Sequence, residues 1–497
     1  MTTAAPAGTF CPVLHSHLPW LARHGTWPVG EEWLHQVWAH SYLPLAGMLQ
    51  RFAAEGRRDV LTLGITPSLA AALDDPHCLR GFHHWLGNWR LRSHEAALRW
   101  RADPVLRELA AAEHRAAGLR LAEFEARWRH GASPVLRGLA DSGVAELLGG
   151  PAAHPFQPLL EPELRRFALR VGLDDAALRW GSRPAGIWAP ECAHGPGMSA
   201  DYAATGVRRF LVDGAALADT SVAHPVGDDV LCFGRDAVIS DRVWSERGYP
   251  AHPAYRDFHT FDHPVGLKPA RITGRDVAPE DKQPYDASAA AAAVDEHVRD
   301  FVAAVLERLR DNGGGLVVAA FDAELFGHWW FEGPVWLEKV LRALPEAGVR
   351  VTTLRGAAEQ VGEPVRLPET SWGAGGDWRT WCGAAVSDLA AANRALQHRV
   401  LAHFRSAPPT TGRAPARDQL LREVLLALSS DWAFMVSRGT GAEYARGRAA
   451  LHHERAHRLL DLLEDDRTTE ATAFAARLRE QDGVFGHLDA RRLRLDG

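Results

Sequence analysis

Short apolar runs that end in a polar residue recur along this chain of 497 residues, and helical segments separate many of them. Each run has a β-branched or aromatic core, as buried strands do, and the alternation of strand and helix indicates a parallel sheet. Seven or eight such strands, with polar side chains gathered at their C-terminal ends, predict a closed or nearly closed (β/α) barrel of the α/β class. The runs cover residues 10–14, 60–63, 144–148, 187–188, 210–212, 230–233, 316–321 and 349–353.

Two regions break this alternation. Residues 83–143 have a wholly helical pattern in which Pro104 and Pro134 begin new segments, so we expect a helical insertion between the second and third strands. Beyond about Pro368 the pattern is helical again, which predicts a C-terminal helical domain of residues 368–497 and leaves residues 1–82 and 144–367 to the barrel. The helical segments predicted in this last domain are 385–404, 418–428, 442–463 and 468–479.

Charge and composition limit which binding partners and which cellular location the sequence allows. A formal net charge of −6 argues against nucleic acid or an anionic membrane as the main partner. The first residues do not resemble a signal peptide and no apolar run reaches the length of a membrane span, so we expect a soluble, cytoplasmic protein. The five cysteines are scattered without a CxxC pair, which supports neither a disulfide framework nor a thiolate zinc site. Nothing in the sequence predicts the oligomeric state.

Two of the apolar runs end in a carboxylate. Residues 185–190 lead to Glu191, and residues 315–321 lead to Asp322. Barrels of parallel strands carry their catalytic groups at these C-terminal strand ends. Two acids in a chain with eighteen tryptophans indicate glycoside chemistry, in which one carboxyl group attacks and the other donates a proton. The alternative is that both acids cap helices or pair with arginines.

The second acid has a neighbour of similar chemistry, Glu324. If the strand continued past Asp322, its alternation would aim both side chains the same way, so Glu324 is a competing candidate. The apolar strand before Asp322 and the aromatic residues after it predict a pKa raised by desolvation, as a proton donor needs. A separation of the two catalytic carboxyl groups of about 5–5.5 Å predicts retention of configuration, and about 6.5–9.5 Å predicts inversion.

Further motifs extend this pattern along the chain. His-Ser-His-Leu-Pro-Trp begins at His15, His-Pro-Phe-Gln-Pro at His154, and Ser-Asp-Trp-Ala-Phe at Ser430. Together with residues 188–194 and 321–328, and in this order, they resemble the five signature regions of glycoside hydrolase family 57. The most similar branch is its 1,4-α-glucan branching enzymes. Residues 233–236, 243–245 and 371–373 match as well, so the resemblance covers essentially the whole chain.

The resemblance implies an incomplete (β/α)7 barrel with a helical insertion and a C-terminal helical domain that completes the substrate groove. It also implies retaining chemistry on an α-1,4-glucan, with transfer to a 6-hydroxyl and with no metal or organic cofactor. Glu191 falls on the nucleophile position and Asp322 on that of the general acid/base. The residues on family substrate-binding positions are Arg235, Trp372 and Asp431, with His15, His17 and His154 lining the site.

Three tryptophans, Trp20, Trp244 and Trp372, lie in loop-like settings beside glycine or proline. Such positions suit a side chain that stacks on the apolar face of a sugar ring, so we predict that these three bind substrate. The alternative for each is that it packs a loop against the protein.

The match departs from the family in three places. Family branching enzymes carry a long loop with a tyrosine at its tip, whereas the corresponding residues 214–229 are few and include no tyrosine. Ala251 replaces a family glycine, and Thr440 replaces a glutamine. Branching requires that another glucan reach the glycosyl-enzyme before water does, and a covering loop favours this outcome. The short loop therefore leaves open an enzyme that is mainly an α-amylase-like hydrolase.

Two alternatives belong to other classes. His15 and His17, two residues apart on a strand end, face the same way, so that with Asp213 or Asp322 they form a candidate metal site for hydrolysis or deacetylation. The second alternative is a protein that binds glucan without turnover.

Overall fold

Parallel strands form the centre of the fold, which the computed structural model describes for residues 7–27, 29–227, 229–406 and 411–495. One ladder has the order β3-β2-β1-β7, and β4 pairs with β6 in a second parallel ladder. The strands are β1 Thr9–Ser16, β2 Leu61–Ile65, β3 Ala145–Leu148, β4 Arg209–Asp213, β5 His224–Pro225, β6 Leu231–Arg235, β7 Leu316–Asp322 and β8 Arg350–Val351.

The two ladders are joined on both sides, so seven segments follow one another around a barrel. On one side, residues 186–187 form parallel bridges to Gly149 after β3 and to Arg209 in β4. On the other side, the amide of Asp236, directly after β6, donates a 2.8 Å hydrogen bond to the carbonyl oxygen of Val318 in β7. The two ladders are linked only by isolated bridges on one side and by this hydrogen bond on the other, so no continuous ladder closes the ring. The ring is therefore an incomplete (β/α)7 barrel, as expected.

The eighth predicted strand lies outside this ring. β8 pairs with Thr9 and Phe10 at the start of β1, on the edge that β2 occupies from Val13 onward. The opposite edge of β1 is taken by β7 along its whole length. The barrel thus has seven members, and the polar residues at the C-terminal ends of its strands lie on the face where barrels of this kind carry their catalytic groups.

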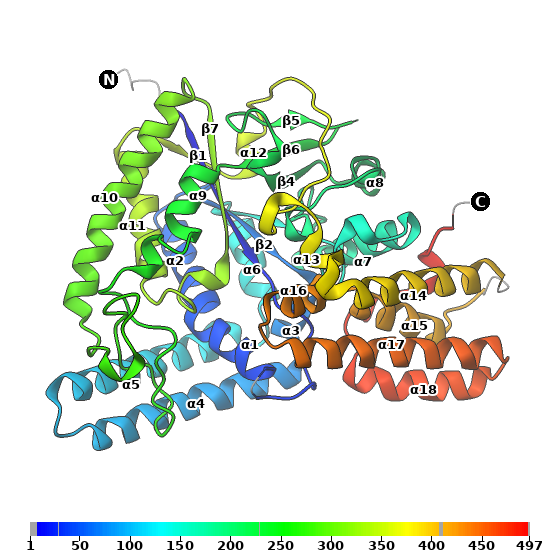
Figure 1. Ribbon diagram of the computed structural model, residues 1–497, viewed down its shortest axis with the longest axis horizontal. Coiled ribbons are helices and arrows are strands. Elements are labelled where there is room, and N and C mark those ends of the chain that lie inside the picture. Colours follow the sequence, from blue (N-terminus) through cyan, green and yellow to red (C-terminus); the bar gives the residue numbers. More distant parts are fainter. Residues whose placement is uncertain (1–6, 28, 228, 407–410, 496–497) are drawn as a thin grey trace.

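Helices cover the barrel and extend it to two sides (Figure 1). α10 and α11 pack side by side near β1 and β7, α4 and α5 form a long antiparallel pair, and α14 to α18 form the C-terminal bundle. The helices are α1 Glu31–Val37, α2 Leu43–Ala54, α3 Pro67–Asp74, α4 Pro76–Arg99, α5 Pro104–Glu123, α6 Ser133–Asp141, α7 Pro162–Trp180, α8 Met198–Thr205, α9 Ala237–Trp244, α10 Ala287–Asp311, α11 Gly333–Glu346, α12 Leu354–Ala357, α13 Arg379–Cys382, α14 Ser387–Ser406, α15 Pro415–Ala427, α16 Ser430–Arg438, α17 Ala442–Glu464 and α18 Thr468–Gln481.

The helical region after β2 begins earlier than residue 83. α4 starts at Pro76, where the carboxylate of Asp75 accepts hydrogen bonds from the amides of His77 and Cys78. Aspartate followed by proline is a strong helix start, because the side chain caps free amides and proline has the required φ angle. The same pair, Asp103 and Pro104, starts α5 at the predicted residue.

The C-terminal bundle agrees with the sequence pattern. The four helical segments predicted beyond Pro368 correspond to α14, α15, α17 and α18, with ends that differ by three residues or fewer. In the described part of the chain, none of the helices combines the length and the apolar character that crossing a membrane requires.

Candidate active site

Glu191 lies at a strained bend shortly after residues 186–187, the barrel segment between β3 and β4. Its φ angle is 62° and that of Cys192 is 48°, both in the left-handed region that non-glycine residues rarely adopt. The amide of Trp372 donates a 2.9 Å hydrogen bond to the carbonyl oxygen of Glu191 and helps to hold this conformation. Strain of this kind persists only where the surroundings maintain it, and it is concentrated at functional sites.

Two donors from distant parts of the chain bind the buried carboxylate of Glu191. Trp372 Nε1 donates to Oε2 at 2.8 Å, and Ser430 Oγ donates to Oε1 at 2.7 Å. Burial raises the pKa of Glu191, while the hydrogen bonds from Ser430 and Trp372 oppose that rise because they stabilise the charged form. The motif at Ser430 was recognised in the sequence, but nothing there predicted that its hydroxyl would reach Glu191.

Ser430 fixes the direction of the hydrogen bonds that connect it to His154 and His15. When Glu191 is ionised, the single hydroxyl proton of Ser430 is donated to it, so His154 Nδ1, 3.0 Å from Ser430 Oγ, must itself be the donor. His154 Nε2 then accepts a hydrogen bond from His15 Nε2 at 3.2 Å. Burial, together with the neighbouring histidines, lowers the pKa of both rings, so both are neutral. His15 also stacks on Trp188, at 4.3 Å between ring centroids.

His17 forms a second polar contact between the barrel and α16. Its Nε2 lies 3.0 Å from both carboxylate oxygens of Asp431, and its Nδ1 lies 2.9 Å from Thr66 Oγ1. Burial lowers the pKa of His17, but the charge and hydrogen bond of Asp431 outweigh it and raise that pKa. Burial raises the pKa of Asp431, but the charge and hydrogen bond of His17, together with His154 and Ser429, outweigh burial and lower that pKa. The two side chains therefore form a buried ion pair.

Asp322, the last residue of β7, is paired with His15 in the β1–β7 register. Burial raises the pKa of Asp322 well above its ordinary value, the charges of Glu324 and Glu191 raise it further, and Arg235 opposes them. Within the described residues, no hydrogen-bond donor reaches the Asp322 carboxylate, in contrast to Glu191. Asp322 thus combines the environment of a carboxyl group that keeps its proton with an unoccupied carboxylate edge.

The strand does not continue to Glu324. A 3₁₀ turn, Ala323–Leu325, follows β7, and the Glu324 carboxylate turns toward two donors. Tyr42 donates its hydroxyl to Oε1 at 2.5 Å, and the His17 amide donates to the same oxygen at 3.0 Å. Burial raises the pKa of Glu324 to about 7, and these donors oppose that rise. Since they favour negative charge on Glu324, the proton that the two acids share is favoured on Asp322.

Arg235 forms an ion pair with Asp213. The two residues end β6 and β4 in register, and Arg235 Nη2 lies 2.6 Å from Asp213 Oδ2. The charge of Arg235 lowers the pKa of Asp322, so the arginine acts on the second acid. Asp213 is engaged in this pair and is unavailable to His15 or His17.

The histidine cluster does not have the geometry of a shared metal site. His17, His154 and Asp431 bring ligand atoms within 4.8 Å of one another. However, the rings of His17 and His154 stack face to face, with centroids 3.8 Å apart at 21°, so their in-plane lone pairs run side by side and do not converge. The nitrogens of both rings are also occupied by Thr66, Asp431, His15 and Ser430.

Two of the three predicted stacking tryptophans border the site. Trp372 is half-buried beside Glu191, and the ring of Trp244, which is 43% exposed, stacks with it at 6.3 Å and 18°. Trp20 is different: it is 3% exposed, packs in the main core and donates Nε1 to the carbonyl oxygen of Gln481. The expectation for Trp20 was wrong, because its loop is covered by the C-terminal helices and offers no ring face to a sugar.

The short loop of residues 214–229 folds back onto the barrel. It contains a 3₁₀ turn, Gly214–Ala216, and β5, which pairs antiparallel with β6; Asp228 lies outside the described residues. His224 Nδ1 and Nε2 lie 2.8 Å from the carbonyl oxygens of Glu363 and Asp219, which hold the loop further.

Comparison with known proteins relates this geometry to a family. Residues 12–368 match the model of glycosyl hydrolase family 57. The chain belongs to this family. Residues 391–493 match a second model, the C-terminal region of 1,4-alpha-glucan branching enzymes. The two matches together cover most of this chain.

Relatives and solved structures agree with this assignment. A probable 1,4-alpha-glucan branching enzyme of Mycobacterium tuberculosis is 53% identical, over 99% of each chain. The crystal structure of a branching enzyme from Pyrococcus horikoshii superposes with a TM-score of 0.93 at 28% identity, covering 99% of this chain and 97% of the other. The α-amylase AmyC from Thermotoga maritima superposes with a TM-score of 0.86 at 27% identity, covering 99% of each.

Proposed function

We propose that this family 57 protein is a retaining 1,4-α-glucan branching enzyme. The observation that carries the proposal is the contrast between two carboxyl groups. Two donors favour the ionised form of Glu191, while Asp322, with no donor among the described residues, is placed to keep a proton. This division of labour is the one that a retaining mechanism needs.

In the first step, the Glu191 carboxylate attacks the anomeric carbon of a glucosyl unit, and the α-1,4 bond breaks. The leaving 4-oxygen takes the proton from Asp322, which gives a covalent glycosyl-enzyme and a shortened chain. In the second step, Asp322 removes the proton from a 6-hydroxyl of another glucan, whose oxygen attacks the same carbon and frees Glu191. Trp244 and Trp372 form the sugar platform, and His15, His17, His154, Arg235 and Asp431 position substrate and acids.

Hydrolysis is the second candidate, and a specific observation favours it. The loop of residues 214–229 is short, includes no tyrosine and is held against β6 through β5, so water meets less of a barrier at the glycosyl-enzyme. The structural similarity to the α-amylase of Thermotoga maritima is in keeping with this outcome. The same two acids serve both reactions, and only the acceptor differs.

Amylose separates the two candidates. The purified protein is incubated with amylose, and new reducing ends are counted alongside α-1,6 linkages released by a debranching enzyme. We expect branch points to form faster than reducing ends. Reducing ends without branches would make the protein a hydrolase, whereas the absence of both in the wild type would refute action on amylose altogether. The Glu191→Gln variant is the control for contaminating activity.

We also propose the predicted division into a catalytic barrel (residues 1–82 and 144–367), an insertion (residues 83–143) and a domain that completes the groove (residues 368–497), with the start of the insertion moved from residue 83 to Pro76, where α4 begins. Support comes from Ser430 and Asp431, which reach from α16 to Glu191 and His17. The five cysteines are free thiols, which supports a reducing, cytoplasmic location.

A further inference from the structure

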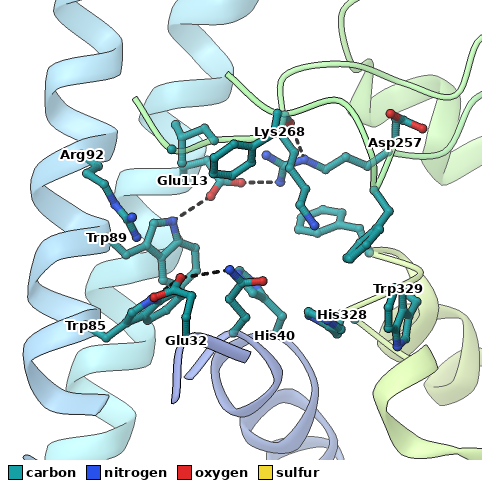
Figure 2. Close-up of a pocket in the computed structure, with 18 residues that line it drawn as sticks. Glu32, His40, Trp85, Trp89, Arg92, Glu113, Asp257, Lys268, His328 and Trp329 are labelled. Atoms are coloured by element: carbon teal, nitrogen blue, oxygen red, sulfur yellow. Dashed lines mark hydrogen bonds and ion pairs between the residues drawn. The ribbon is translucent and has the colours of Figure 1, made fainter. Parts of the chain in front are cut away.

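A pocket lies beside the loop that follows β7, since His328 and Trp329 of that loop line it (Figure 2). Its walls are α4 and α5, the segment of residues 256–268, and residues 327–331, and neither Glu191 nor Asp322 lines it. The space between the lining side chains is about 660 Å³ when the open mouth is included.

Aromatic rings make up much of the lining. Trp85 Nε1 donates to Glu32 and Trp89 Nε1 to Glu113, both at 2.9 Å, so the polar atoms of these indoles are satisfied and their rings face the pocket. Trp329 is 45% exposed and packs on Phe258, with ring centroids 4.4 Å apart. An exposed tryptophan at the mouth of a pocket with polar walls offers a stacking surface for the C–H face of a sugar.

The charges of the lining suit a neutral ligand with many hydroxyl groups. The lining contains as many acids as bases: Glu32, Glu113 and Asp257 against Arg92, Arg256 and Lys268. Glu113 pairs with Arg256, and Asp257 pairs with Lys282 from outside the pocket. Burial lowers the pKa of His40 to about 3 and that of His328 well below its usual range, so both are neutral. Mixed signs at close range disfavour a strongly charged ligand and match hydroxyls, which both donate and accept.

The ammonium group of Lys268 is free to bind a ligand. Its Nζ lies 3.5 Å from the ring centroid of Phe258, and among the described residues it has no hydrogen-bond or ion-pair partner. Figure 2 shows it directed into the pocket, on the side opposite Trp85 and Trp89. Burial, and then the charge of Arg256, lower the pKa of Lys268 to about 7, so its hydration is already incomplete before a ligand arrives.

The pocket shares its wall with the acid-carrying loop. The amide of Trp329 donates to the carbonyl oxygen of Glu324 at 3.2 Å. His40 lies in the π-helical turn Trp38–Tyr42, from which Ser41 donates to the carbonyl oxygen of Ala323 and Tyr42 to the Glu324 carboxylate. The wall of the pocket is therefore hydrogen-bonded to the elements that hold Glu324.

We propose that this pocket binds part of the α-glucan chain away from the bond that is cleaved, with Trp329 as the stacking surface and Lys268 and Glu32 as hydrogen-bonding groups. The inference rests on the proposed function for the identity of the sugar, but the pocket's binding can be measured without turnover. Binding far from the reacting bond adds affinity for long chains that short chains cannot use.

Amine labelling tests the proposal directly, because the chain has three lysines, Lys268, Lys282 and Lys339. The Glu191→Gln variant, which leaves the glucan intact, is acetylated at neutral pH with and without maltoheptaose, and each lysine is followed by peptide mass spectrometry. We expect maltoheptaose to slow acetylation of Lys268 several-fold. Lys339, which pairs with Asp295 on an exposed surface, is the internal control and should not change.

A second variant links the protection to the pocket. In Glu191→Gln combined with Trp329→Ala, the same protection should require about tenfold more maltoheptaose, the loss expected for one stacking contact. Val335→Ala truncates an exposed side chain that does not line the pocket and should leave protection unchanged. If Trp329→Ala does not fold, Phe261→Ala, another lining residue, replaces it.

Unchanged acetylation of Lys268, under conditions where calorimetry shows maltoheptaose bound to the protein, would overturn the proposal. Protection by inorganic phosphate but not by maltoheptaose would overturn it too, since it would identify an anion site. The proposed function fails by a different result, the absence of products from amylose with the wild-type enzyme, and Lys268 protection would stand in that case.

Discussion

Replacing Ser430 by alanine should lower the activity of the enzyme at acidic pH and change its activity little at higher pH. The hydroxyl of Ser430 donates a 2.7 Å hydrogen bond to the buried Glu191 carboxylate. A hydrogen bond to a charged group contributes about 1.5–3 kcal/mol, which favours ionised Glu191 roughly ten- to hundredfold. Since the bond stabilises the charged form, its loss raises the pKa of Glu191, and more of the nucleophile is protonated and inactive at acidic pH.

The assay is the pH profile of kcat/KM on amylose, with turnover counted as the sum of new α-1,6 linkages and new reducing ends. The acidic limb of this profile reports the group that must be ionised in the free enzyme, so in Ser430→Ala it should move to higher pH. On that limb the rate should fall by about ten- to hundredfold, the same factor as the lost hydrogen bond. Ser430→Thr keeps the hydroxyl and should restore the wild-type limb.

Ser437 offers a matched control on the same helix, α16, because its hydroxyl donates to the carbonyl oxygen of Thr380. Ser437→Ala should leave the acidic limb in place. Ser430→Ala also leaves His154 Nδ1 without its acceptor, so a loss of roughly 1–3 kcal/mol in the free energy of unfolding is expected. If the acidic limb of Ser430→Ala coincides with that of the wild type, the role given to Ser430 is wrong.

The remaining predictions concern the two acids, the platform and the metal alternative. Glu191→Gln and Asp322→Asn should each remove most activity on amylose while the thermal midpoint changes little; near-wild-type turnover by either would contradict the assignment. Tyr42→Phe removes a donor from Glu324, so the proton shared with Asp322 moves toward Glu324, and the basic limb of kcat/KM should move to lower pH. Trp372→Ala should weaken glucan binding in calorimetry more than it lowers stability, whereas an unchanged affinity would make Trp372 a packing residue. Activity should survive prolonged treatment with a chelator, and its loss would revive the metal alternative.

The sequence predicted the barrel well because buried parallel strands leave a local signal. An unbroken apolar run that ends in a polar residue identifies both the strand and the residue at its functional end, as for β7 and Asp322. The start of α4 was missed although its signal, Asp75 followed by Pro76, is equally local. Trp20 was misjudged for a different reason: whether a loop is covered depends on α18 and the residues after it, which lie more than 440 positions along the chain.

The partners of the two acids had no local signal. Ser430 lies 239 positions from Glu191, and Tyr42 lies 282 positions from Glu324. Spacing along a chain reports the face of a helix or strand, but it does not report which side chain of another element donates a hydrogen bond. The sequence therefore identified the carboxyl groups, whereas the separation of their protonation states emerges only from the packed fold.

The difference between the two carboxyl groups also explains why we propose that the C-terminal region is part of the active site. The barrel supplies both acids, but the two donors that hold Glu191 as a carboxylate, Trp372 and Ser430, come from beyond β8. The strain at Glu191 is restrained by the Trp372 amide, and that at His154 by the Ser430 amide, which donates to the His154 carbonyl oxygen at 3.0 Å. Without these contacts only the charge of His17 would oppose the effects of burial and of Asp431, both of which favour the protonated form of Glu191. The difference between the two carboxyl groups, on which the double displacement depends, would then shrink.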